Sequence, residues 1–440
     1  MSNIKNLLLV FILWTMGISA YYALSHRIRG AGAEKDGSEG LKPQEASMSK
    51  EALQLWAESR SYPETEFRET GYYQAYQQSL ALVKRAGSVP YLDDWKSMGP
   101  TNVGGRTIAL AVDPKNPNVL YAGSASGGLW RMTMNGTSYT WQNLDTKFPV
   151  LGVNAIAIDP RDSKVLYIGT GEVYGYGKSI GGLYQRNTRG SYGLGILKSI
   201  DSGVTWRKSL DWTSSQQRGI QVIKLHPTNP DILFAGTTEG IFRSRDAGAT
   251  WEQVANTVMV TDIVLTPGNP DILFAACGNL GSPEMGIYRS KNGGEPGSFQ
   301  KLAGGLPTSF TGKAMLAVSA AAPTNVWADI ANESGTIGLF RSQNNGDSWT
   351  NINSSTDWAS IQGWYSHYVR IHPKDVNRVL LGGQSSCYGS ATGARLFKRL
   401  GECMPTIIPM PIIPPTEISS MLPTTGVYTR ARTVVPPSGP

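Results

Sequence analysis

Between residues 107 and 382 the chain alternates short apolar runs with polar turns rich in proline, asparagine and glycine. One phrase returns six times: an apolar run, a Pro/Asn turn, and a second apolar run that usually contains an aromatic residue. Apolar runs of this length between turn signals are typical of β-strands rather than helices. The phrases occupy 109–123, 155–169, 222–236, 263–275, the region around 323–328, and 369–382.

A second motif, Ser-x-Asp/Asn-x-Gly-x-Thr/Ser-Trp, follows these phrases after a third apolar run. It is clear at 199–206, 244–251 and 342–349 and weaker at 133–141 and 290–299. Asp or Asn near Gly favours a tight turn, and the aromatic residue then starts the next strand, where it can bury about 150–250 Å². Because they recur, we interpret these as structural turn residues: Asp201, Gly203, Trp206, Asp246, Gly248, Trp251, Asn292, Asn344, Gly346 and Trp349.

Three strands, the Asp turn and a fourth strand make one repeat of about 45 to 50 residues, which suits a four-stranded propeller blade. We therefore predict an all-β fold. It is a β-propeller of six or more four-stranded blades over residues 93–401, in a closed or incomplete ring, and a short helical segment precedes it.

These repeats resemble the Asp-box (BNR) β-propellers: sortilin-type receptor propellers, sialidases, xyloglucanase-type glycoside hydrolases and photosystem assembly propellers. Segments 95–106 and 169–172 resemble large secreted bacterial proteins of the sortilin-like branch. The resemblance covers roughly residues 93–400. It implies the fold far more specifically than the activity, because propellers host many unrelated functions.

The N-terminal region has three expected parts. Residues 1–22, with Lys5 before an apolar stretch and small residues behind it, predict a cleaved signal peptide or an uncleaved anchor. Residues 23–50 predict a linker, and 51–92 predict amphipathic helices interrupted at Pro63 that dock on the propeller. We expect an exported protein, extracellular, at the cell surface or periplasmic, that contacts the membrane only through an uncleaved N-terminal segment.

Residues 402–440 show neither strand alternation nor a blade phrase, and we expect them to be disordered. Reading the degenerate codons of 404–428 one base earlier permits another blade phrase. A shift around 385–395 permits another Asp turn. Our hypothesis is that the coding sequence carries frame slips and that an intact relative continues with further blades. The nucleotide sequence of the gene tests this directly.

Composition narrows the function classes. The 50 glycines and 26 prolines in 440 residues suit many short strands joined by turns. The net charge of +7 is dispersed without aromatic-interleaved basic runs, which favours a solvated basic surface and argues against nucleic-acid binding. Three cysteines give no disulfide framework, and His226 and His372 occupy turn positions, so we expect no metal and no cofactor.

The largest departure from the repeat is an insertion at 173–194, rich in Gly, Tyr and Arg, directly after Glu172. Irregular loops on a propeller face are where binding usually occurs, although a flexible loop with a capped glutamate fits equally well. Trp358, Trp364 and Tyr365, on another irregular stretch, are expected to share this face. The predicted ligand-binding residues are Arg106, Glu172, Tyr174, Tyr176, Tyr184, Arg186 and Trp364.

Catalysis has less support. A xyloglucanase-like site needs two carboxylates, but the matching loop of the first blade, 123–130, has none. A sialidase-like site needs three arginines, of which Arg106 is one candidate. The arginines at 131, 243, 289 and 341 recur as repeat features. No catalytic residue is assigned, and Glu172 is the one candidate.

The favoured function is non-catalytic binding of a protein or polysaccharide ligand on a propeller face. The alternative is a glycoside hydrolase acting on a polysaccharide. The second alternative is an assembly factor for membrane-associated complexes.

Overall fold

The computed structural model describes residues 71–86, 105–176, 178–180, 183–186, 188–215, 217–384, 387–390 and 398–401. The leader, the linker, the first predicted helix and the anomalous tail lie outside these residues. Helix α3 (Gly71–Ala86) is the part of the helical segment that is described. Its Tyr76 hydroxyl donates to the Lys147 carbonyl at 3.2 Å. None of the described helices is long and apolar enough to cross a membrane.

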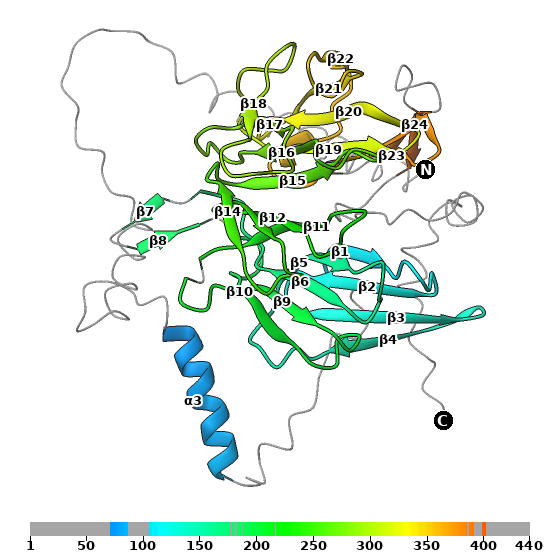
Figure 1. The fold of residues 1–440 in the computed structure, drawn as a ribbon. Coiled ribbons are helices and arrows are strands. Elements are labelled where there is room, and N and C mark those ends of the chain that lie inside the picture. Colours follow the sequence, from blue (N-terminus) through cyan, green and yellow to red (C-terminus); the bar gives the residue numbers. More distant parts are fainter. Residues whose placement is uncertain are drawn as a thin grey trace, which may run out of the picture. The chain divides into compact units, whose positions relative to one another are not determined.

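The rest of the described chain forms six four-stranded antiparallel sheets, which are the blades of a propeller (Figure 1). The first blade comprises β1 (Thr107–Val112), β2 (Val119–Ser124), β3 (Leu129–Asn135) and β4 (Ser138–Leu144). The second comprises β5 (Val153–Ile158), β6 (Leu166–Thr170), β9 (Gly195–Ser199) and β10 (Arg207–Asp211). The third comprises β11 (Ile220–Leu225), β12 (Leu233–Thr237), β13 (Gly240–Ser244) and β14 (Glu252–Ala255).

The fourth blade comprises β15 (Val260–Leu265), β16 (Leu273–Cys277), β17 (Gly286–Ser290) and β18 (Gln300–Lys301). The fifth comprises β19 (Ala314–Ser319), β20 (Ala322–Ala331), β21 (Thr336–Ser342) and β22 (Thr350–Asn353). After the short helix η1 (Ser360–Gln362), the sixth comprises β23 (Tyr368–His372), β24 (Asp375–Gly382), β25 (Cys387–Ser390) and β26 (Lys398–Gly401). The predicted all-β propeller with four strands per blade is confirmed.

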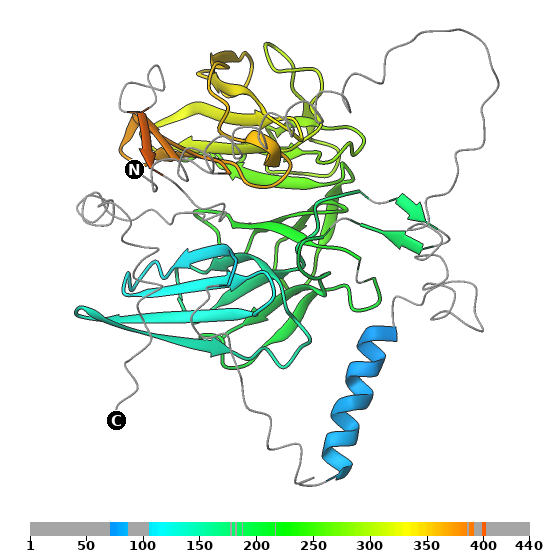
Figure 2. The same ribbon diagram turned by 180° about the vertical axis from the view of Figure 1, so that it is seen from behind.

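Two features depart from the simple repeat. The insertion of the second blade forms its own hairpin, β7 (Lys178–Ile180) and β8 (Leu183–Gln185), which projects from the ring in both views (Figures 1 and 2). Cys387 takes part in a disulfide bond, whereas Cys277 is free and buried. The number and spacing of the cysteines did not indicate a disulfide.

The first strands of the blades surround a central cavity of about 200 Å³, to which β1, β5, β11, β15, β19 and β23 all contribute side chains. In each of the first four blades the pairing of the first two strands shifts by one residue at the same point. Such a bulge re-aims one side chain. The re-aimed residues that line the cavity are Ile108, Asn154, Gln221 and Thr261.

Neighbouring blades pack the turn of one against an aromatic residue of the other. A Cβ at Gly248 would lie 3.0 Å from Cε1 of Tyr167, and one at Gly346 would lie 2.7 Å from Cε1 of Phe274. Both glycines also have positive φ, +77° and +84°. Only glycine fits both the backbone angle and the space, which explains why it recurs.

Side-chain hydrogen bonds close the repeated turn. The Ser244 hydroxyl accepts from the Gly248 N–H at 2.8 Å, and Asp246 Oδ1 accepts from the Thr250 N–H at 2.8 Å. In the second blade, hydrogen bonds from the hydroxyl and the N–H of Thr205 lower the pKa of Asp201 to about 2. The structure therefore places these carboxylates within their own turns.

Basic residues of the third strands hold the turn of the following blade. Arg243 Nη2 lies 3.0 Å from Glu295 Oε2, and Arg289 Nη1 lies 2.6 Å from Asp347 Oδ1. Lys198 Nζ donates to the Ala247 carbonyl at 2.6 Å. These contacts give Arg243, Arg289 and Lys198 a role between blades.

Candidate functional site

Strand alternation places the irregular segments on one face of the propeller. In an antiparallel blade, the loop from the second to the third strand emerges at the same end as the connection into the first strand. Glu172 follows the second strand β6, Arg106 precedes β1, and Trp364 and Tyr365 precede β23. The Pro/Asn turns and the repeated Asp turns emerge at the opposite end, so they do not contribute to this face.

An ion pair between Arg106 and Glu172 forms the centre of the site. Arg106 Nη2 donates to Glu172 Oε2 at 2.7 Å, and Nη1 donates to Oε1 in parallel. The Glu172 side chain is fully buried, whereas the Arg106 side chain is 25% exposed. Although burial opposes its charge, the pair with Glu172 raises the pKa of Arg106 above its usual value. A bidentate pair of this kind also fixes orientation.

Tyr174 supplies the second donor to Glu172, since its hydroxyl lies 2.7 Å from Oε1. Burial, and then the charge of Glu172, raise the pKa of Tyr174 well above its usual value, so the hydroxyl keeps its proton. The ring packs edge-on against Trp364 at 5.5 Å and Tyr365 at 5.2 Å between centroids. Glu172 is therefore held on both oxygens and enclosed by aromatic rings.

Arg189 covers this cluster from the solvent side. Its guanidinium lies 4.2 Å from the Tyr365 ring centroid and 5.8 Å from that of Trp364. Its carbonyl accepts from Arg106 Nη2 at 2.9 Å. Arg189 is exposed and Trp364 is half-buried, so these two side chains present the cluster to a ligand.

A second cluster lies in and beside the same insertion. Arg186 pairs with Glu239, and its guanidinium lies 5.8 Å from the ring centroid of Tyr176. Arg218 Nε lies 3.8 Å from Glu239 Oε1. Burial opposes the charge of Glu239, but the bond and the charge of Arg186 lower its pKa. Tyr176 is 37% exposed and is the most accessible aromatic residue here.

The predicted residues thus fall into two groups. Arg106, Glu172, Tyr174 and Trp364 meet in the first cluster. Arg186 and Tyr176 meet in the second, and the side chain of Tyr184 lies outside the described residues.

Sequence reasoning missed Glu239 and Asn279, whose Nδ2 donates to the Trp364 carbonyl at 2.8 Å. Glu239 had a usable signal. It follows the second strand of the third blade, as Glu172 follows that of the second. The expectation for Trp358 was wrong. It is only 2% exposed, and its Nε1 donates to buried Asp329 Oδ1 at 2.9 Å, because the ring belongs to the core between the fifth and sixth blades.

The arrangement limits what Glu172 can do. A general acid or base must reach a substrate proton, but both oxygens of Glu172 already accept hydrogen bonds in a buried position. Within the described part of the chain, no group of three His, Cys, Asp or Glu side chains is arranged to hold a metal ion. The more exposed side chains of the site are those of Arg189, Trp364 and Tyr176.

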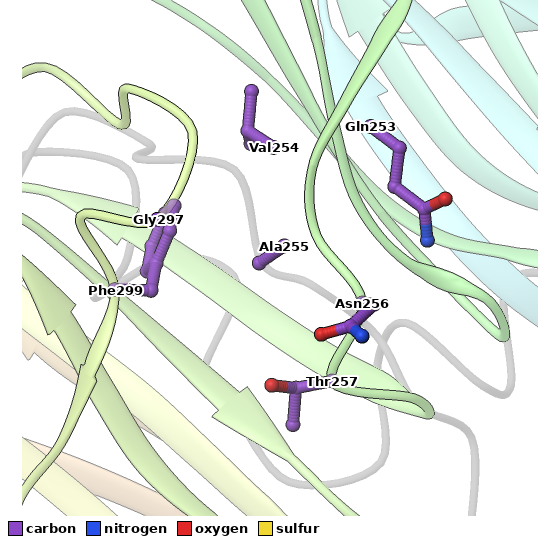
Figure 3. A pocket seen from close by; sticks show the side chains of 7 residues that line it. All are labelled: Gln253, Val254, Ala255, Asn256, Thr257, Gly297 and Phe299. Carbon is purple, nitrogen blue, oxygen red and sulfur yellow. The ribbon is translucent and has the colours of Figure 1, made fainter.

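A separate surface pocket of about 310 Å³ lies beside β14, lined by neutral residues (Figure 3). It is larger than the central cavity but offers no ionisable side chain, so we assign it no chemistry. Its lining residues are Gln253, Val254, Ala255, Asn256, Thr257, Gly297 and Phe299.

No protein-family profile and no curated protein matches the chain. Solved propeller structures share its fold. An ancestral GH74 enzyme is 19% identical, with a TM-score of 0.50, over 67% of this chain and 37% of that one. The GH74 enzyme of Niastella koreensis is 18% identical, with a TM-score of 0.43, over 66% of this chain and 52% of that one. YCF48 bound to D1 peptide is 14% identical, with a TM-score of 0.44, over 68% of this chain and 83% of that one.

The likeness to the ancestral GH74 enzyme supports the propeller fold alone. The chain spans about half the length or less of the two GH74 enzymes.

Proposed function

We propose that this protein is a non-catalytic, ligand-binding β-propeller that is exported and belongs to the Asp-box, sortilin-like group. The ligand is a protein or a glycan, and it binds the face that carries Arg189, Trp364 and Tyr176. The observation that carries the proposal is the state of Glu172, which is buried and held by Arg106 and Tyr174. Its role is to fix the binding surface.

The exposed side chains support a binding role. Arginine and aromatic residues are enriched in recognition surfaces because they combine large contact area with directional polar groups. Arg189 is already positioned by stacking on Tyr365, and Trp364 is fixed through its carbonyl by Asn279. Pre-positioning lowers the entropy lost when a ligand binds.

Binding to glycan and peptide arrays, followed by titration calorimetry of the strongest hit, tests the proposal. We expect Trp364→Ala and Arg189→Ala each to weaken binding at least tenfold. Trp141→Ala is the matched control, because Trp141 is 44% exposed on the outer strand β4. Equal loss in all three variants, or in none, would contradict the assignment of this face.

The hydrolase alternative needs a second measurement on the same polysaccharides, namely release of reducing ends. We expect none. Release by the wild-type protein that is lost in a folded Glu172→Gln variant would replace the binding proposal with an enzymatic one.

A further inference from the structure

The central cavity carries an unbalanced set of charges. Its lining includes Lys224 on β11, Asp262 on β15, Lys313 just before β19 and Arg370 on β23. Three positive side chains therefore face one carboxylate. The four residues come from four different blades, so the propeller ring alone brings them together.

The single carboxylate forms no ion pair with these neighbours among the described residues. Asp262 Oδ1 accepts from the Ile263 N–H at 2.9 Å, and Oδ2 accepts from the Leu316 N–H at 3.1 Å. Among the described residues, the ammonium groups of Lys224 and Lys313 have no hydrogen-bond or ion-pair partner. Lys313 is nonetheless only 5% exposed.

Burial in the cavity wall lowers the pKa of both lysines. Burial lowers the pKa of Lys313 to about 8, although Asp262 and Asp329 oppose the shift, and Arg370 adds to it. Burial also lowers the pKa of Lys224, with Asp262 opposing and Arg370 adding. The nearby carboxylates thus do not fully offset the cost of burying either ammonium group.

An orphan acceptor lies on the same wall. Asn279 lines the cavity and uses Nδ2 for the Trp364 carbonyl, which fixes the orientation of its amide. Its buried Oδ1 has no partner among the described residues. A ligand that brings an O–H group would satisfy this oxygen, whereas leaving it unpaired costs free energy.

The size of the cavity limits the ligand. Sites for drug-sized molecules usually enclose about 300–1,000 Å³. The cavity here is about 200 Å³, which suits a small ion with some water.

We propose that the central cavity is a binding site for a small, doubly charged oxyanion of the hydrogen phosphate or sulfate class. Lys224, Lys313 and Arg370 supply its positive contacts, and Asn279 accepts the O–H of hydrogen phosphate. This proposal does not rest on the binding role proposed for the face that carries Arg189 and Trp364.

Calorimetry of the full-length protein with inorganic phosphate and with sulfate, at constant ionic strength in a chloride background, tests the site. We expect saturable binding of one ion, at least tenfold weaker in Lys313→Gln and in Arg370→Gln. Lys374→Gln is the matched control, because Lys374 is exposed in the turn after β23 of the same blade as Arg370. Binding equal to that of chloride, or unaffected by the cavity substitutions, would overturn the proposal.

Two further measurements keep the test decisive. If the cavity variants do not fold, phosphate must still raise the melting temperature of the wild-type protein above that in an equal ionic strength of chloride. No such rise would also overturn the proposal. Titration with methyl phosphate shows whether the bound oxyanion is a free ion or part of a larger ligand. Tighter binding of methyl phosphate than of inorganic phosphate indicates an anion carried by a larger ligand. Weaker binding indicates the free ion.

Discussion

Arg106 and Glu172 lie 66 positions apart and join the segment before the first blade to the insertion of the second. Arg106 also donates to the Tyr365 hydroxyl at 2.7 Å, 259 positions away in the segment before the sixth blade. One guanidinium thus links three blades, including the first and the last. The geometry of the face that carries Arg189 and Trp364 therefore depends on one side chain that contacts residues of three blades.

Glu172→Gln should reduce the free energy of unfolding by about 2–3 kcal/mol, because it leaves a partly buried Arg106 without its counter-charge. The amide preserves the shape but replaces one acceptor with a donor that faces the Arg106 and Tyr174 donors. Denaturant unfolding measures the change. Glu333→Gln is the control, since Glu333 is exposed and forms no ion pair among the described residues. A neutral Glu172→Gln would show that the pair does not stabilise the ring.

Gly248→Ala should destabilise the protein by about 2–4 kcal/mol, through left-handed backbone strain plus overpacking. The new Cβ would lie 2.8 Å from Ser209 Oγ and 3.0 Å from Tyr167. Gly268→Ala separates the two causes, because Gly268 has φ +79° and nothing within 4 Å of its Cβ position. There we expect only about 1–2 kcal/mol. Equal losses in denaturant unfolding would exclude the contact with Tyr167 as a cause.

The carboxylates of the repeated turns, Asp201 and Asp246, should make the stability of the protein depend on pH in the acid range. Hydrogen bonds from Thr205 lower the pKa of Asp201 to about 2, and those from Thr250 lower that of Asp246 to about 2 although burial opposes this. Their stabilisation is therefore complete above the unfolded pKa of about 4 and is lost as the pH falls towards 2.

Asp201→Asn combined with Asp246→Asn should flatten the fall in melting temperature between pH 4 and pH 2. Asparagine is tolerated in this turn, since Asn344 Oδ1 accepts from the Ser348 N–H at 3.0 Å. Asp271→Asn, at an exposed position of a Pro/Asn turn, is the control and should leave the fall unchanged. An equally steep fall in the double variant would rule out these carboxylates as its source.

Lys313 should make the protein more stable as the pH rises. Its pKa is lowered to about 8, so the unfolded chain binds the proton more tightly than the folded one. The cost of charging Lys313 is fully present below pH 8 and is relieved as the pH rises from 8 to the unfolded value of about 10.4. The charged groups around it are Asp262, Asp329 and Arg370.

Lys313→Met should therefore raise the free energy of unfolding at pH 7 by about 1–3 kcal/mol in phosphate-free buffer, and should remove the rise above pH 8. Thermal melts between pH 6 and pH 10 measure both effects. Lys374→Met is the exposed control and should change neither. Destabilisation of Lys313→Met at pH 7 would show that the ammonium makes favourable contacts in the fold.

The repeat made the strands and turns readable from sequence. The strands of one blade are separated by short turns, so local signals such as Asp201 followed by Gly203 place them in order. The candidate site was readable only in part. Glu172 and Tyr174 stood out because they interrupt the repeat, whereas Glu239 was overlooked although it occupies the equivalent loop. Lys224 and Asp262 gave no signal at all, because alternation along a strand does not show which residues will line a channel.

The sequence by itself determined the class of fold, the four strands of each blade and the residues of the repeated turns, because these depend on contacts within one repeat. Only the tertiary structure decided which polar groups meet. Closing the ring brings Arg106 to Glu172 and Tyr365, and it turns a candidate catalytic acid into a buried partner of an arginine. The same closure gathers Lys224, Lys313 and Arg370 around one cavity. Contacts between residues so far apart depend on the curvature of the whole ring, which no local pattern encodes.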